Sequence, residues 1–106
     1  MLNLNNLQQI TGNNQKLMES LLSQFLAITD DDLKKLYQAI LHVNHTEVAS
    51  LAHRIKGASA TVGADQLASI AAELESKAKA GLGNYLTLYN QLTENYKALQ
   101  SAVADL

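Results

Sequence analysis

The chain has 106 residues, contains no cysteine and no proline, and carries a formal net charge of −2 at pH 7. Its length suits one domain over residues 1–106, and the missing cysteines exclude disulfides and thiolate metal sites. Eight scattered Lys and Arg argue against nucleic-acid binding. Neither an apolar run of roughly 20 residues nor a signal-peptide pattern occurs, so we expect a cytoplasmic domain without membrane contact.

The absence of proline and the five glycines favour long helices joined by short turns. Apolar periodicity predicts helices over residues 3–10, 14–28, 30–43, 45–62, 64–79 and 83–104. We therefore predict an all-α fold, an antiparallel up-and-down four-helix bundle. The last helices and the 14–43 segment form this bundle, and the 3–10 helix, ended by Gly12, caps one end.

The 14–43 segment is divided, in this prediction, at Thr29-Asp30-Asp31-Asp32. Thr29 or Asp30 would cap a new helix, with the remaining acids in its first turn, where the helix dipole favours negative charge. A metal site is the weaker interpretation, because consecutive side chains fan out around a helix. The apolar stripes of the two halves are Leu17, Met18, Leu21, Leu22, Phe25 and Leu26, and then Leu33, Leu36, Tyr37, Ile40 and Leu41.

Capping residues mark the predicted helix starts, and two further apolar stripes complete the prediction. Asn13 or Asn14 caps the helix over 14–28, and Asn44, with Glu47 three residues on, caps the helix that ends at Gly63. The helix over 64–79 buries Leu67, Ile70, Ala71, Leu74 and Ala78. The last helix alternates steps of three and four through Leu82, Tyr85, Tyr89, Leu92, Tyr96, Leu99, Val103 and Leu106, which favours packing within the chain over a stacking platform or an intermolecular coiled coil.

His53 lies in the middle of the 45–62 helix and points away from its core. The centre of the apolar arc, which Val48, Leu51, Ala52, Ile55 and Val62 form, lies about 155° around the helix from the histidine. The neighbours on the histidine's own face are small: Thr46, Ala49, Ser50, Gly57 and Ala60. Lys56 follows three residues later, close enough to share an anion bound at the ring. An exposed imidazole on such a flat face indicates a site that another macromolecule reaches.

The run His53-x-x-Lys56-Gly57, followed by Gly63, resembles the signature of histidine-containing phosphotransfer (HPt) domains. These helical modules relay phosphoryl groups between receiver domains in two-component signalling, and the resemblance extends from Leu4 to the C-terminus in element order. It implies that His53 accepts a phosphoryl group from a receiver-domain aspartate and passes it to another. It also implies that the receiver supplies the acids and the Mg²⁺. We expect no cofactor in this chain and no autonomous catalysis, since it has no glycine-rich phosphate loop.

Glu75 is the candidate that orients the histidine ring. The helices over 45–62 and 64–79 are joined by a tight turn and should be antiparallel neighbours. His53 lies ten residues before Gly63 and Glu75 twelve after it, so their side chains should sit at nearly the same height. HPt domains commonly place a glutamate or glutamine at this offset. Lys56, and Lys79 one turn beyond Glu75, would offset the negative charge that arrives on the ring.

The docking surface is expected to be the small-residue patch Thr46, Ala49, Ser50 and Ala60, with an apolar rim from neighbouring helices. Metal binding by His42, His45 and His53 is not expected, because their spacing gives no fixed ligand geometry. The alternative function is a helical interaction module that carries no phosphate. We expect a monomer, and the sequence leaves open the partner kinase and regulator, the input signal and the direction of phosphate flow. It fits either a free-standing carrier or the C-terminal domain of a larger hybrid kinase, in which case the parent protein would be an inner-membrane sensor kinase.

Overall fold

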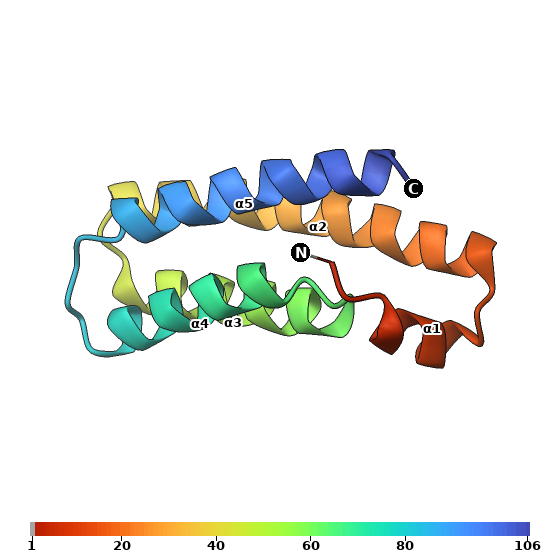
Figure 1. The fold of residues 1–106 in the computed structure, drawn as a ribbon. Coiled ribbons are helices and arrows are strands. Elements are labelled where there is room, and N and C mark those ends of the chain that lie inside the picture. Colours follow the sequence, from red (N-terminus) through yellow and green to blue (C-terminus); the bar gives the residue numbers. More distant parts are fainter. Residues whose placement is uncertain (1) are drawn as a thin grey trace.

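The structure, a computed structural model, describes residues 2–106. Within them it contains five helices and no strand: α1 (Asn5–Thr11), α2 (Gln15–Leu41), α3 (His45–Thr61), α4 (Asp65–Lys79) and α5 (Leu86–Ala104). Helices α2 and α5 run together along one side of the molecule, α3 and α4 along the other, and α1 lies at one end (Figure 1). The most extensive packing is between α3 and α4, followed by that of α2 on α3 and of α4 on α5.

The helix ends follow the capping residues expected from the sequence. The side chains of Asn14 and Asn44 accept hydrogen bonds from the backbone of Leu17 and Glu47, at the starts of α2 and α3. Gly12 ends α1 in the left-handed conformation, with φ of 62°. These caps satisfy backbone groups that would otherwise lack partners at helix ends.

Gly63 has a more specific role in the turn between α3 and α4. Its φ is +79°, and a Cβ atom at this position would lie 1.7 Å from the backbone oxygen of Asn3. The backbone N–H of Asn3 donates to the Gly63 oxygen at 2.8 Å, and the Asn6 side chain donates to the Thr61 oxygen. The glycine therefore lets the N-terminal segment pack directly against this turn.

The predicted break in the 14–43 segment is wrong, because α2 continues without interruption from Gln15 to Leu41. Thr29 and Asp30 do not cap a helix, and Thr29 and Asp32 are buried in the middle of α2. Salt bridges of 3.0 Å join Asp30 to Lys34 and Asp31 to Lys35. These i, i+4 pairs support the helix through a stretch of low intrinsic propensity.

The core is formed by one stripe of each long helix, and these stripes are narrower than the sequence predicted. The predicted residues of α3 and most of those of α4 are buried, and Ile70 is half-buried. Five residues assigned to apolar stripes are exposed instead: Leu17, Tyr37, Leu41, Leu82 and Leu106. Leu82 lies in the loop before α5, which begins at Leu86 rather than at residue 83. No helix of residues 2–106 is long and apolar enough to cross a membrane.

Candidate phosphoacceptor site

The side chain of His53 stands on the outer face of α3. The opposite face of this helix is buried through Val48, Leu51, Ala52 and Ile55, which fixes the rotation of the helix and turns position 53 outward. The imidazole is 68% exposed, and its Nδ1 atom lies 3.0 Å from Oε2 of Glu75. An exposed ring on a rigid helix is thus held at one nitrogen.

Glu75, on α4, is the buried carboxylate to which the other ionisable groups of the site bind. Its side chain is only 7% exposed, and Lys56 donates to Oε1 at 2.7 Å while Lys79 lies 3.1 Å from Oε2. The hydrogen bond from Lys56 lowers the pKa of the Glu75 carboxyl to about 2, with smaller contributions from Lys79 and His53, although burial acts in the opposite direction. The carboxylate is therefore ionised at neutral pH.

The ionised carboxylate decides which histidine nitrogen carries the proton. A carboxylate without a proton can only accept hydrogen bonds, so the Nδ1–H of His53 must donate to Glu75. In the neutral ring this leaves the lone pair on Nε2. That atom makes no hydrogen bond within residues 2–106, and it is the nucleophilic position of the imidazole.

The residues around His53 on the same face of α3 have small side chains or none. Thr46, Ser50, Gly57 and Ala60 are exposed, and Ala49 is half-buried. Apart from its own stretch of helix, a Cβ atom at Gly57 would meet no atom of residues 2–106 within 4 Å. Internal packing therefore does not require glycine there, and helix propensity disfavours it by about 1 kcal/mol relative to alanine.

The structure thus brings His53, Lys56, Glu75 and Lys79 together, although both lysines bind Glu75 and neither forms a hydrogen bond with the histidine ring within residues 2–106. The sequence predicted that Glu75 would lie at the height of His53 and did not indicate that its side chain would be buried with three partners. His42 and His45 do not join the site: their Nδ1 atoms contact the Gln38 backbone oxygen and the Tyr85 hydroxyl, respectively.

A second ion pair beside the site was missed by the sequence interpretation. The Nε of Arg54, the residue after His53, lies 3.3 Å from Oδ2 of Asp32 on α2. Asp32 falls on the buried stripe only if α2 is continuous, with Phe25, Thr29 and Leu36 at steps of three and four. Residues 13–41 contain neither glycine nor proline, so no residue of the 29–32 stretch required a break in the helix.

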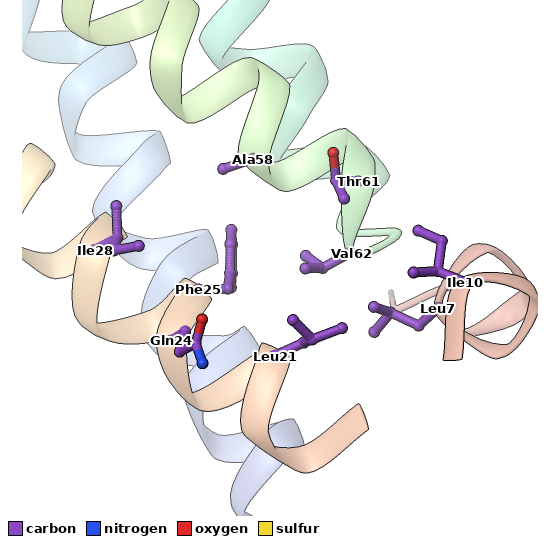
Figure 2. Close-up of a pocket in the computed structure, with 9 residues that line it drawn as sticks. All are labelled: Leu7, Ile10, Leu21, Gln24, Phe25, Ile28, Ala58, Thr61 and Val62. Atoms are coloured by element: carbon purple, nitrogen blue, oxygen red, sulfur yellow. The ribbon is translucent and has the colours of Figure 1, made fainter. Parts of the chain in front are cut away.

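An apolar groove follows the seam between α2 and α3 and ends at α1 (Figure 2). Its lining includes Leu21, Phe25 and Ile28 of α2, Ala58 of α3 and Ile10 of α1. Ile10 and Ile28 are both exposed. The α2 side of the histidine-bearing helix therefore offers accessible apolar surface.

The site is thus an exposed histidine on a helical bundle, held at Nδ1 by a buried glutamate and open at Nε2. The Hpt domain family matches residues 20–102, and the chain belongs to this family. Comparison with curated proteins gives no match.

Two solved structures share the fold. One is histidine-containing phosphotransfer protein B (HptB) from Pseudomonas aeruginosa PAO1, with a TM-score of 0.91 and 23% identity, covering 98% of this chain and 91% of that chain. The other is the HPT domain of the Hpt sensor hybrid histidine kinase from Shewanella, with a TM-score of 0.80, 20% identity and the same coverage. At these identities the likeness establishes the fold.

Proposed function

We propose that the chain is a phosphorelay intermediate in which His53 accepts a phosphoryl group from the aspartate of one receiver domain and transfers it to the aspartate of another. Membership of the Hpt family supports the class of function. The observation that carries the assignment to His53 is its exposed ring, bound to Glu75 at Nδ1 and open at Nε2. The four long helices act as the antiparallel bundle that holds this ring in place.

The transfer step uses the lone pair of Nε2. This atom attacks the phosphorus of the aspartyl phosphate, a bond forms between nitrogen and phosphorus, and the bond between phosphorus and the carboxylate oxygen breaks. The aspartate leaves with the electron pair. The ring keeps its Nδ1 proton and becomes cationic, so the hydrogen bond to Glu75 strengthens as the reaction proceeds. Onward transfer reverses these changes on a second receiver.

Lys56 and Lys79 contribute in two ways. They keep Glu75 ionised, and their ammonium groups lie on the α4 side of the ring, where they reduce the repulsion of an incoming phosphoryl group. We expect the receiver to hold the Mg²⁺ and the acids around its own aspartate, while this chain presents the nucleophile.

The receiver docks, in this proposal, on the small-residue face of α3. Thr46, Ser50 and Ala60 leave room for the loops around a receiver's aspartate, and a side chain at Gly57 would take up that room. The apolar groove of Figure 2 lies on the α2 side of this face and supplies apolar contact area.

The test is phosphoryl transfer from a panel of phosphorylated receiver domains of the source organism. Wild type should acquire an acid-labile, base-stable phosphate, and His53→Gln should abolish it while helicity and melting temperature stay nearly unchanged, because an exposed side chain contributes little to the core. His42→Gln is the matched control, since it removes another exposed histidine, and it should label normally. Label that persists in His53→Gln would overturn the assignment, and receiver binding without any label would favour the unphosphorylated interaction module.

A further inference from the structure

The Asp32–Arg54 pair is an unusual feature of the seam between α2 and α3. The Asp32 side chain is only 4% exposed, in the middle of a helix, and its one partner within residues 2–106 is the Nε of Arg54. Its other oxygen, Oδ1, is buried without a hydrogen-bond partner in that part of the chain. A buried carboxylate bonded this incompletely contributes little to stability, and an apolar residue of similar size would serve the core at least as well.

Arg54 carries its charge at the surface beside His53. It follows His53 directly on α3, and its side chain is 58% exposed. Only Nε is bound to Asp32, so the two terminal nitrogens of the guanidinium have no hydrogen bond within residues 2–106. Binding through Nε removes part of the rotamer freedom of a long side chain, so these nitrogens are fixed in position before a partner arrives.

The pair also marks the border between the apolar groove and the histidine face. Ile28 and Ala58 line the end of the groove away from α1 (Figure 2). Asp32 follows Ile28 by one helical turn, and Arg54 precedes Ala58 by one turn. A partner that covers both the groove and His53 must therefore pass over Arg54.

We propose that Arg54 binds a carboxylate of the docked receiver and that Asp32 is the positioning residue that holds Arg54 for this contact. The inference rests on the proposed function, since a partner that brings an aspartyl phosphate to His53 presents an anionic surface there. Adjacent residues on a helix diverge by about 100°, so Arg54 meets the partner at the rim of the site and does not act on the phosphoryl group. The pair then determines which receivers bind and how fast they associate.

The experiment measures transfer to His53 from the receiver that labels the wild type fastest, in parallel with labelling by the small donor phosphoramidate. Arg54→Ala should lower kcat/KM for the receiver roughly tenfold, through KM, and should reduce its dependence on salt concentration. Asp32→Asn should also lower kcat/KM for the receiver, but by a smaller factor. Labelling by phosphoramidate should stay at the wild-type rate in both variants, because the contact is made only with a protein partner.

Two further variants separate this role from a structural one. In the double variant, Asp32→Asn should add nothing to Arg54→Ala, because Asp32 acts through Arg54. Lys97→Ala removes an exposed positive charge from α5 and should transfer normally. Melting temperatures are measured beside the transfer rates, because Arg54→Ala leaves the Asp32 carboxylate buried without its partner. The double variant removes that charge as well, and it keeps the test decisive if either single variant folds poorly.

Several results would overturn the proposal: receiver transfer unchanged in Arg54→Ala, additive effects in the double variant, or equal loss with phosphoramidate. The last would place Arg54 in the chemistry of the ring. If no receiver labels the wild type at all, the proposed function fails and this inference fails with it. That result differs from normal labelling that is insensitive to Arg54, which would refute this inference alone.

Discussion

Helix α3 meets a buried carboxylate in each of its two main seams, Glu75 in the seam with α4 and Asp32 in the seam with α2. Each carboxylate and its partner on α3, His53 or Arg54, are separated by 22 residues. Because the spacing is equal, the two members of each pair lie at the same height on antiparallel helices that are joined by a tight turn. The two seams are therefore built alike but differ in how completely they satisfy the charge they bury.

Both carboxylate oxygens of Glu75 have partners. Its two oxygens contact Lys56, Lys79 and His53 at distances between 2.7 and 3.1 Å, and the shortest contact, with Lys56, has the length of a strong charge-assisted hydrogen bond. Asp32 has a single contact of 3.3 Å and one oxygen without a partner in the described chain. The first seam thus favours a fixed ring and a defined proton position, whereas the second leaves donors of Arg54 available to something outside the molecule.

The largest effect that would test this contrast is expected from Glu75→Ala. Without the carboxylate, the Nδ1 proton of His53 has no acceptor and the two lysines lie near the ring without an anion between them. Loss of a group that orients a reactive histidine typically costs 10–100-fold, so we expect phosphoryl transfer from a receiver to slow by about that factor. The transfer rate is measured from the phosphate label that the protein has acquired at a series of quenched time points.

Glu75→Gln is the matched control for this change. Its amide oxygen can still accept from Nδ1, so it should retain more activity than Glu75→Ala while its lysine contacts weaken. Equal rates in wild type and both variants would show that the hydrogen bond does not prepare the ring, and the two seams would then differ only in charge.

A second effect is the dependence of stability on pH. Because the pKa of Glu75 is lowered from 4.5 to about 2 in the folded chain, its ionised form stabilises the fold at pH values above 4.5. This contribution is lost as the pH falls from there toward 2, since protonation then breaks the contacts with Lys56 and Lys79. Denaturation of wild type and Glu75→Gln at a series of pH values should show a difference that is constant near neutrality and shrinks in acid. A difference that stays constant down to pH 2 would contradict the lowered pKa.

Much of the fold and part of the site could be predicted from sequence, because both depend on periodicity along single helices. His53, the small face around it and the caps Asn14, Asn44 and Gly63 were all apparent from local spacing. The height of Glu75 relative to His53 followed from the tight turn at Gly63. Local patterns determine which face of a helix is buried and where the helix stops.

The features that were missed depend on contacts between helices. Three consecutive acids suggested a helix start at Thr29 or Asp30, because such residues favour caps and first turns. Tertiary packing and the pairs Asp30–Lys34 and Asp31–Lys35 favoured a continuous helix instead. Once α2 continues, Asp32 must turn into the core, and its partner Arg54 can be identified only when the side chains of two helices are placed together.

The smallest expected effect is on stability, and it comes from Thr29, a neighbour of Asp32 in the seam between α2 and α3. The hydroxyl of Thr29, one turn before Asp32 on the same stripe of α2, is buried without a hydrogen-bond partner within residues 2–106. Thr29→Val replaces it with a methyl group of nearly the same shape, so it should raise the free energy of unfolding by up to about 1 kcal/mol. Thr29→Ser, the control, keeps the hydroxyl and loses the methyl, and should lower stability. Chemical denaturation measures both changes. Destabilisation by Thr29→Val would mean that the hydroxyl has a polar partner, such as a bound water shared with Asp32. The buried polar groups of the α2 seam would then have partners, as those of the α4 seam do.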